Sequence, residues 1–275
     1  MTSAADSLTE SSVRRFLPAD TSVTALTVVD TIASTNTALR EAAHAGAPHG
    51  TVLIASSQSA GRGRRGRTFF SPDGTGLYIS VLLRPSIAAE RAVRITTAAA
   101  VSAADAIAQV TGKACAIKWV NDLFLDGKKV AGILTESALR TDGTLAYAVL
   151  GIGINVAPPA GGFPPEIAEI AGAILPSPIE NGRAKLAASF LTEFFRRYGE
   201  IADEQPAYME EYRRRCFVIG HRVEVIRGED RYMADAIAVD DEAGLIVRRD
   251  DGTEEILSSG EISIRGTNTQ EGQNA

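Results

Sequence analysis

The segment LFLDGKKVAGILTES, residues 123–137, places an Asp-Gly pair between two β-prone runs. Such a pair is typical of a two-residue hairpin turn, which needs backbone conformations that Asp and Gly tolerate. A second turn, Asp142-Gly143, precedes the apolar run LAYAVLGIGINV at 145–156. Successive hairpins produce antiparallel pairing, so this part of the chain predicts a mostly antiparallel or mixed sheet.

The same mixture of elements extends in both directions. Further strands are predicted within residues 21–34, 51–56, 76–83 and 114–119, and helices after Ser34 and over 91–110, 183–198 and 206–215. These elements follow no regular βαβ rhythm, and neither GxGxxG before a helix nor a Walker sequence occurs. The fold class is therefore α+β.

From residue 216 the pattern changes to short strands separated by Gly and Asp turns, which indicates a small barrel. We place a large domain at 19–215 and the small one at 216–267. Residues 157–181 are rich in Pro and Gly and predict a long connection with one short helix. The polar ends, 1–18 and 268–275, are predicted to be flexible tails.

Composition limits the class of protein. The 275 residues carry a formal net charge of −6, which disfavours a general nucleic-acid binder. Cys115 and Cys216 form no disulfide framework or metal motif, and the beginning of the chain is no signal peptide. No apolar stretch reaches membrane-spanning length. We therefore expect a soluble cytoplasmic protein without a membrane partner.

The run QSAGRGRRGR, residues 58–67 and here called the arginine loop, combines permanent cations with a flexible backbone. Arginine presents planar donors to carboxylate or phosphate, and glycine allows close approach. A loop that closes on a specific anion is one interpretation. A nucleic-acid patch and a solvated linker are the alternatives, and the lack of interleaved aromatic residues weakens the first of these.

Three further polar clusters follow predicted strands or turns. Ser34-Thr35-Asn36 offers hydroxyl and amide groups, although simple helix capping would explain it as well. KWVND at 118–122, with Lys129 beyond it, can bind a phosphate ester, but a lone strand lysine is usually an edge residue. GIGINV at 151–156 lets a flat ligand approach the strand, or is a packed sheet edge. Together these residues indicate nucleotide-dependent activation of a small acid.

In order and spacing, these motifs resemble those of the bacterial biotin protein ligases. The shared pieces are STN at 34–36, the arginine loop, KWVND, KKVAGIL at 128–134, GIGINV and GEISIR at 260–265. The resemblance covers about residues 25–266. Val120 replaces the family's usual proline and Phe69 its usual tryptophan, and neither change removes a charge.

The resemblance implies a class II aminoacyl-tRNA synthetase-like catalytic domain that binds biotin and ATP, followed by an SH3-like barrel. It implies catalytic roles for Lys129, Arg62 and Asp122. The biotin contacts implied are Ser34, Thr35, Asn36, Gln58, Gly61, Arg62, Gly63, Arg64 and Lys129. The ATP or adenylate contacts implied are Arg64, Arg67, Phe69, Lys118, Trp119, Asn121, Asp122 and Asn155.

The implied reaction joins biotin to ATP as biotinyl-5′-AMP and then transfers biotin to a lysine of the biotin carboxyl carrier protein domain of acetyl-CoA carboxylase or a related biotin-dependent carboxylase. Mg²⁺ would arrive with ATP rather than at a protein metal site. The few residues before the first strand lead us to expect no specific DNA partner. A monomer or a sheet-mediated homodimer is expected. A lipoate or octanoate transferase and a nucleic-acid-binding module are the rival functions.

Overall fold

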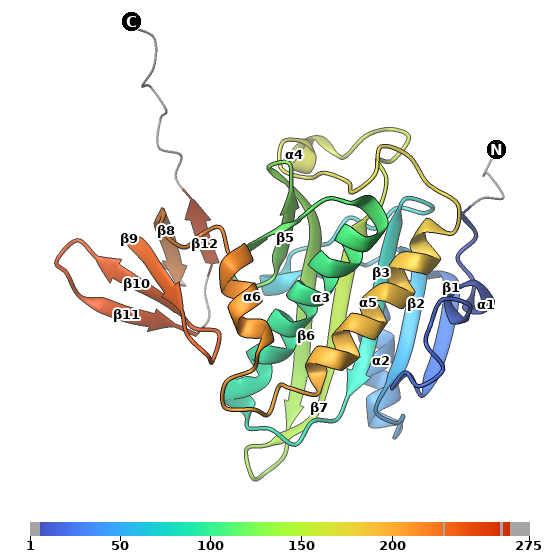
Figure 1. Cartoon of the computed structure of the whole chain (residues 1–275), viewed down its shortest axis with the longest axis horizontal. Coiled ribbons are helices and arrows are strands. Elements are labelled where there is room, and N and C mark those ends of the chain that lie inside the picture. The colour runs from blue at the N-terminus through green and yellow to red at the C-terminus, as the bar shows by residue number, and fades with distance from the viewer. Residues whose placement is uncertain (1–5, 228, 259–260, 265–275) are drawn as a thin grey trace, which may run out of the picture.

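A computed structural model describes residues 6–227, 229–258 and 261–264 of the chain (Figure 1). Its large domain is built on a seven-stranded sheet in the order β1-β2-β3-β7-β6-β5-β4. The strands are β1 Ala25–Ile32, β2 Thr51–Gln58, β3 Gly76–Leu83, β4 Ala116–Lys118, β5 Asp122–Leu125, β6 Lys128–Leu139 and β7 Leu145–Asn155. Only the β1–β2 pair in this sheet is parallel, so the predicted mixed sheet is confirmed.

The hairpin predicted at 123–137 forms as β5 and β6, with Leu125 opposite Lys128. Asp126 and Gly127 both take positive φ, 51° and 75°, as a tight primed turn requires. The register of this hairpin pairs Asp122 of β5 with Gly132 of β6, and Phe124 with Lys129. The hairpin therefore places two charged groups, Asp122 and Lys129, on adjacent strands, where their side chains form an ion pair.

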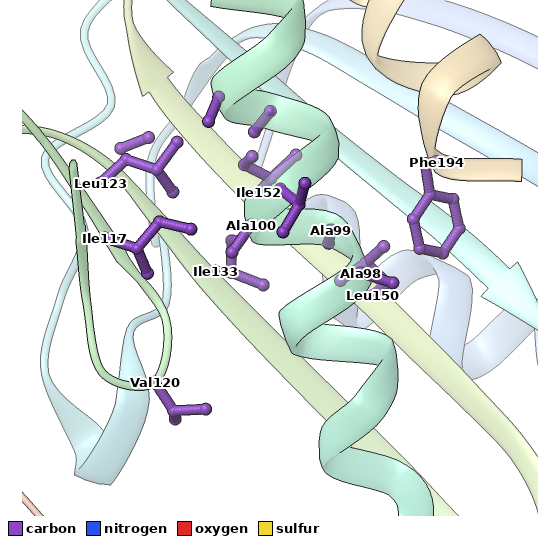
Figure 2. Packing of buried hydrophobic residues seen from close by; sticks show 14 of the residues in the cluster. Ala98, Ala99, Ala100, Ile117, Val120, Leu123, Ile133, Leu150, Ile152 and Phe194 are labelled. Carbon is purple, nitrogen blue, oxygen red and sulfur yellow. The ribbon is translucent and has the colours of Figure 1, made fainter. Parts of the chain in front are cut away.

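Two long helices cover one face of the sheet, α3 Val93–Thr111 and α5 Gly182–Tyr198 (Figure 1). The alanines of α3 are small enough to let the helix lie close to the strands, and Ala98–Ala100 pack near Leu150 and Ile152 of β7 (Figure 2). Removal of this apolar surface from water, at about 25 cal/mol per Å², is the main stabilising contribution. The helix α2, Thr35–His44, covers part of the other face.

The C-terminal domain is a five-stranded antiparallel sheet in the order β11-β10-β9-β8-β12. Its strands are β8 Arg222–Arg227, β9 Asp230–Val239, β10 Leu245–Arg249, β11 Glu254–Leu257 and β12 Glu261–Ile264. Helix α6, Tyr208–Arg215, leads into it. The Trp119 indole donates to the Ala243 carbonyl at 2.9 Å, so the turn between β9 and β10 contacts the large domain directly.

The predicted flexible tail over residues 1–18 is wrong for residues 6–18. Helix α1, Glu10–Arg14, begins with a capping box at Thr9 and buries Val13. Asp6 forms an ion pair with Arg183 of α5 at 2.9 Å, and each side chain is only 8% exposed. Residues 6–18 include few apolar side chains and show no hydrophobic periodicity. The partner of Asp6, Arg183, lies far along the chain, so sequence analysis did not detect this structure. The predicted tail at 268–275 lies outside the described residues.

The long connection between β7 and α5 contains one short helix, α4 Pro165–Ala168, as predicted. Within the described ranges, no helix is both long and apolar enough to cross a membrane.

Candidate active site

A cavity of about 300 Å³ lies where the arginine loop crosses the sheet beside the N-terminus of α2. It gathers every site residue predicted from the sequence except Gly61 and Asn155. Those that line it are Ser34, Thr35, Asn36, Gln58, Arg62, Gly63, Arg64, Arg67, Phe69, Lys118, Trp119, Asn121, Asp122 and Lys129.

A neutral polar network forms one wall of the cavity. Ser34 caps α2 by accepting from the Thr37 backbone at 3.5 Å, so the capping interpretation is also correct. The Thr35 backbone and hydroxyl both donate to Gln58 Oε1, at 2.9 and 3.1 Å. The Ser80 hydroxyl of β3 lies 2.7 Å from Thr35 Oγ1 and 2.6 Å from Asn36 Oδ1, within hydrogen-bonding distance of both. These groups are fixed by one another, which orients them before any ligand arrives.

Asn36 connects this wall to β6 and β7. Its Nδ2 donates to Glu136 Oε2 at 3.1 Å and to the Leu134 carbonyl at 3.3 Å. A Cβ at Gly151 would lie 2.0 Å from Asn36 Oδ1. The glycine at 151 therefore makes room for the Asn36 amide, and it also lines the cavity.

The arginine loop folds back on itself above the sheet. Arg62 bridges to Thr68, and a short 3-10 turn at Arg64–Gly66 puts Arg65 and Gly66 at positive φ. Gly61 lies outside the cavity because its backbone packs against the Phe69 carbonyl, where a Cβ would come within 2.4 Å. Its role is to allow this crossing rather than to line the cavity.

A chain of charged and amide groups forms the opposite wall. Lys129 Nζ lies 2.7 Å from Asp122 Oδ2, and the Asn121 amide donates to Asp122 Oδ1 at 2.9 Å. Arg64 reaches down from the loop and donates to Asn121 Oδ1 at 2.8 Å. The loop is thereby fastened to the KWVND segment, in which the Trp119–Val120 peptide is cis.

Phe69 lies on a platform made by two glycines that face each other across β6 and β7. Gly132 and Gly153 are register partners, and a Cβ at Gly153 would be 2.4 Å from the Phe69 ring. A Cβ at Gly132 would lie 3.5 Å from Lys129 Cε, so this glycine also faces the Lys129 side chain. Tyr78 packs edge-on to Phe69, and burial raises the pKa of its phenol, which stays protonated and donates to the Pro72 carbonyl. The Phe69 ring therefore lies between the wall that contains Asn36 and the wall that contains Lys129.

Asn155, predicted to face adenine, is placed elsewhere. Its amide donates to the Gly172 carbonyl at 2.9 Å and does not line the cavity. The contact ties the end of β7 to the connection that follows it.

Sequence reasoning missed several residues of the site. Glu136 and Ser80 carry no motif, and their roles arise only from strand pairing across the sheet. Ile262 of the C-terminal domain also reaches the cavity. The lining residues outside the named motifs are Thr68, Phe124, Ile170 and Ile262, and those inside a motif but not singled out as contacts are Arg65, Gly132, Ile133, Leu134, Gly151, Ile152 and Gly153. The alternation of side chains along β6 and β7 could have indicated which of these share a face.

The arrangement combines fixed neutral donors and acceptors with a cluster of cations and a single carboxylate beside Lys129. Cations at Lys129, Arg64 and Lys118 can offset repulsion between two anionic reactants, and the neutral wall can bind an uncharged polar group. Among the described residues, no three His, Cys, Asp or Glu side chains gather in a manner that could hold a metal ion.

Comparison with known proteins agrees with this chemistry. The Biotin/lipoate A/B protein ligase family matches residues 28–155, and the Biotin protein ligase C terminal domain matches residues 218–265. The bifunctional ligase/repressor BirA of Bacillus subtilis is 32% identical over 257 residues, which cover 92% of this chain and 78% of that protein.

A biotin–[acetyl-CoA-carboxylase] ligase of Mycobacterium tuberculosis is 30% identical over 243 residues, covering 86% of this chain and 88% of that protein. Among solved structures, biotin protein ligase from Aquifex aeolicus in complex with biotin and ATP has a TM-score of 0.71 and 25% identity. The match covers 88% of this chain and 99% of that one.

Proposed function

Because the chain belongs to the biotin protein ligase family, we propose that its cavity activates biotin with ATP and passes it to a protein lysine. In the first step the biotin carboxylate attacks the α-phosphorus of ATP, forming biotinyl-5′-AMP and releasing pyrophosphate. In the second, a lysine amine of the carrier attacks the acyl carbon, loses its proton and displaces AMP. Neither step needs a nucleophile from this chain, so positioning and charge carry the catalysis.

The observation that supports this best is the pairing of two unlike walls in one cavity. Thr35, Asn36 and Gln58 would hold the uncharged ureido end of biotin through the hydroxyl and amide groups described above. Lys129 would lie between the carboxylate and the α-phosphate, held by Asp122. Phe69, between the walls, would contact both the biotin rings and the nucleotide.

The cations of the loop would act on the phosphates and the new anhydride. Arg62 and Gly63 are proposed to contact biotin, Arg64 to contact both biotin and nucleotide, and Arg67 and Lys118 the nucleotide. Trp119 and Asn121 would complete the nucleotide side of the cavity. Magnesium enters as part of the Mg–ATP substrate. Asn155 would stabilise the connection after β7 rather than contact adenine, since its amide is bonded to Gly172.

The names of the relatives suggest the carrier. The Mycobacterium tuberculosis and Paracoccus denitrificans relatives are biotin–[acetyl-CoA-carboxylase] ligases. A biotin carboxyl carrier domain of acetyl-CoA carboxylase, or of a related biotin-dependent carboxylase, is the acceptor we propose.

Two linked assays test the proposal. ATP–pyrophosphate exchange should depend on added biotin, and the purified carrier domain should then gain biotin at one lysine, with its Lys→Ala variant as the unlabelled control. Lipoate in place of biotin tests the other activity covered by the matched family. Exchange driven by lipoate and absent with biotin would overturn the proposed substrate.

A further inference from the structure

The carboxylate of Glu136 receives donors from two separate parts of the chain. It lies on β6, four residues beyond Gly132, and its side chain is 18% exposed. Arg62 of the arginine loop approaches Oε1 to 2.9 Å, and Arg40 of α2 approaches the same oxygen to 3.3 Å. Asn36 donates to Oε2 at 3.1 Å. A half-buried carboxylate with two cations and an amide joins the loop, α2 and the sheet at one point.

The contact to Arg62 fastens the first limb of the loop. Arg62 is paired in a β-bridge with Thr68, so whatever holds Arg62 also restrains the strand-like base of the loop. Arg64 is fastened separately, to Asn121 on the far side of the cavity. The loop is thus attached to both walls, and Glu136 supplies the attachment on the Asn36 side.

The contact to Asn36 sets the direction of an amide in the neutral wall. With Nδ2 directed to Glu136 and to Leu134, Oδ1 is left to accept from Ser80 at 2.6 Å. Rotating the amide would place two acceptors, Oδ1 and a Glu136 oxygen, against each other. The single carboxylate therefore fixes one side chain of the wall and one of the loop together.

We propose that Glu136 is a positioning residue, which couples the orientation of Asn36 to closure of the arginine loop through Arg62. It touches neither reactant. The effect of Glu136 on retention of the adenylate rests on the proposed function. Its effect on the position of the arginine loop does not. Loss of its charge should release the loop while leaving the fold and the Lys129–Asp122 pair in place.

The loop provides its own probe because trypsin cleaves after arginine. Limited trypsinolysis of the ligand-free protein, read by mass spectrometry for new ends at residues 62–67, should be about two- to fivefold faster in Glu136→Gln, the range that an ion pair of this exposure supports. Arg40→Gln is the matched control, because it removes the other cation from the same carboxylate without altering the loop. It should be cleaved like the parent, and thermal unfolding should show both variants folded.

Two further readouts separate positioning from a general loss of structure. In a double-mutant cycle, Glu136→Gln should add nothing to cleavage at the remaining loop arginines in an Arg62→Gln background. Raising the salt should accelerate parent cleavage relative to Glu136→Gln, because only the parent has an ion pair to screen. Equal cleavage of parent and Glu136→Gln, or effects that multiply in the cycle, would overturn the proposal.

The enzymatic arm uses biotin-dependent exchange and single-turnover release. Glu136→Gln should raise KM for biotin and release the adenylate about two- to fivefold faster, with kcat for exchange close to the parent value. A fall in kcat with unchanged KM and unchanged release would contradict a positioning role. If the parent shows no exchange at all, the proposed function fails while the proteolysis result still decides the role of Glu136.

Discussion

Lys128 and Lys129 are adjacent on β6 but have different surroundings. Lys129 Nζ lies 2.7 Å from Asp122 inside the cavity, whereas Lys128 donates to the Glu169 carbonyl outside it. Side chains alternate across a strand, so adjacent lysines sample opposite sides. The two lysines therefore allow a matched comparison, because they carry the same charge and are adjacent in the sequence.

Lys129→Ala should lower biotin-dependent pyrophosphate exchange by at least ~10²-fold, since a preorganised donor that strengthens during attack is lost. Lys128→Ala should exchange at close to the parent rate. The measurement is the initial exchange rate at saturating ATP for both variants. Near-normal exchange in Lys129→Ala would remove this residue from the catalytic role proposed for it.

Gly153 shows how a residue without a side chain can control an aromatic one. An alanine Cβ there would lie 2.4 Å from the Phe69 ring, so Gly153→Ala must displace the ring, at a cost of about 1–3 kcal/mol. We expect weaker biotin and ATP binding and a lower melting temperature, measured by calorimetry. Gly161→Ala, which meets no atom within 4 Å, is the control. The Gly153→Ala defect in stability should shrink in a Phe69→Ala background, and its persistence there would show that the ring is not the obstacle.

At the scale of elements, the arginine loop acts through its attachments. Arg64 joins the loop to Asn121 at 2.8 Å, so Arg64→Gly removes one fastening and adds a flexible position. Adenylate synthesis should partly survive, but the adenylate should escape faster than from the parent, because the loop shields the anhydride less. Single-turnover release of labelled adenylate, with a blot for biotin on added albumin, measures this. Unchanged release and no stray labelling would show that Arg64 takes no part in closure.

The N-terminal segment is an element held by a buried ion pair. Asp6→Ala leaves Arg183 charged with its partner carboxylate gone, in a place where each side chain is 8% exposed, and should cost about 3 kcal/mol of unfolding free energy. Glu10→Ala breaks the Arg14–Glu10 pair on the same segment, which is half exposed, and should cost less than about 1 kcal/mol. Urea unfolding of the two variants compares them. A similar small loss in both would mean that the segment is not anchored by Asp6.

These elements also show which parts of the structure were open to prediction. The β5–β6 hairpin and α3 follow from local turn chemistry and periodicity, and both were predicted correctly. The site was predicted where a motif carries it, as in KWVND and the arginine loop. Glu136 and Ser80 were not, because they reach the site through long-range strand pairing. The α1 segment was also missed because its anchor is long-range, an ion pair between Asp6 and Arg183 of α5.

At the scale of the whole molecule, two buried thiols and two buried phenols share one direction of pKa shift. Burial raises the pKa of Cys115 and of Cys216 to about 11. The phenols of Tyr198 and Tyr208 are likewise raised by burial. Each of these groups is held in its neutral, protonated form by the fold.

The consequence is a loss of stability in alkali with a defined sign. An unfolded thiol titrates near pH 8.5, so below that pH both states keep the proton and the thiols add no pH dependence. Between about pH 8.5 and 11 the unfolded chain releases protons that the folded chain retains, and the free energy of unfolding must fall as pH rises. The loss should be on the order of 2 kcal/mol per thiol by pH 10.5, and the tyrosines add to it above pH ~10.

Urea midpoints at pH 7.5, 9.0 and 10.5 measure the trend. Cys115→Ala, despite its lower starting stability, should show a shallower slope than the parent because one titrating group is gone. Equal slopes would mean that Cys115 titrates alike in both states, and a midpoint independent of pH would contradict the burial of the whole set.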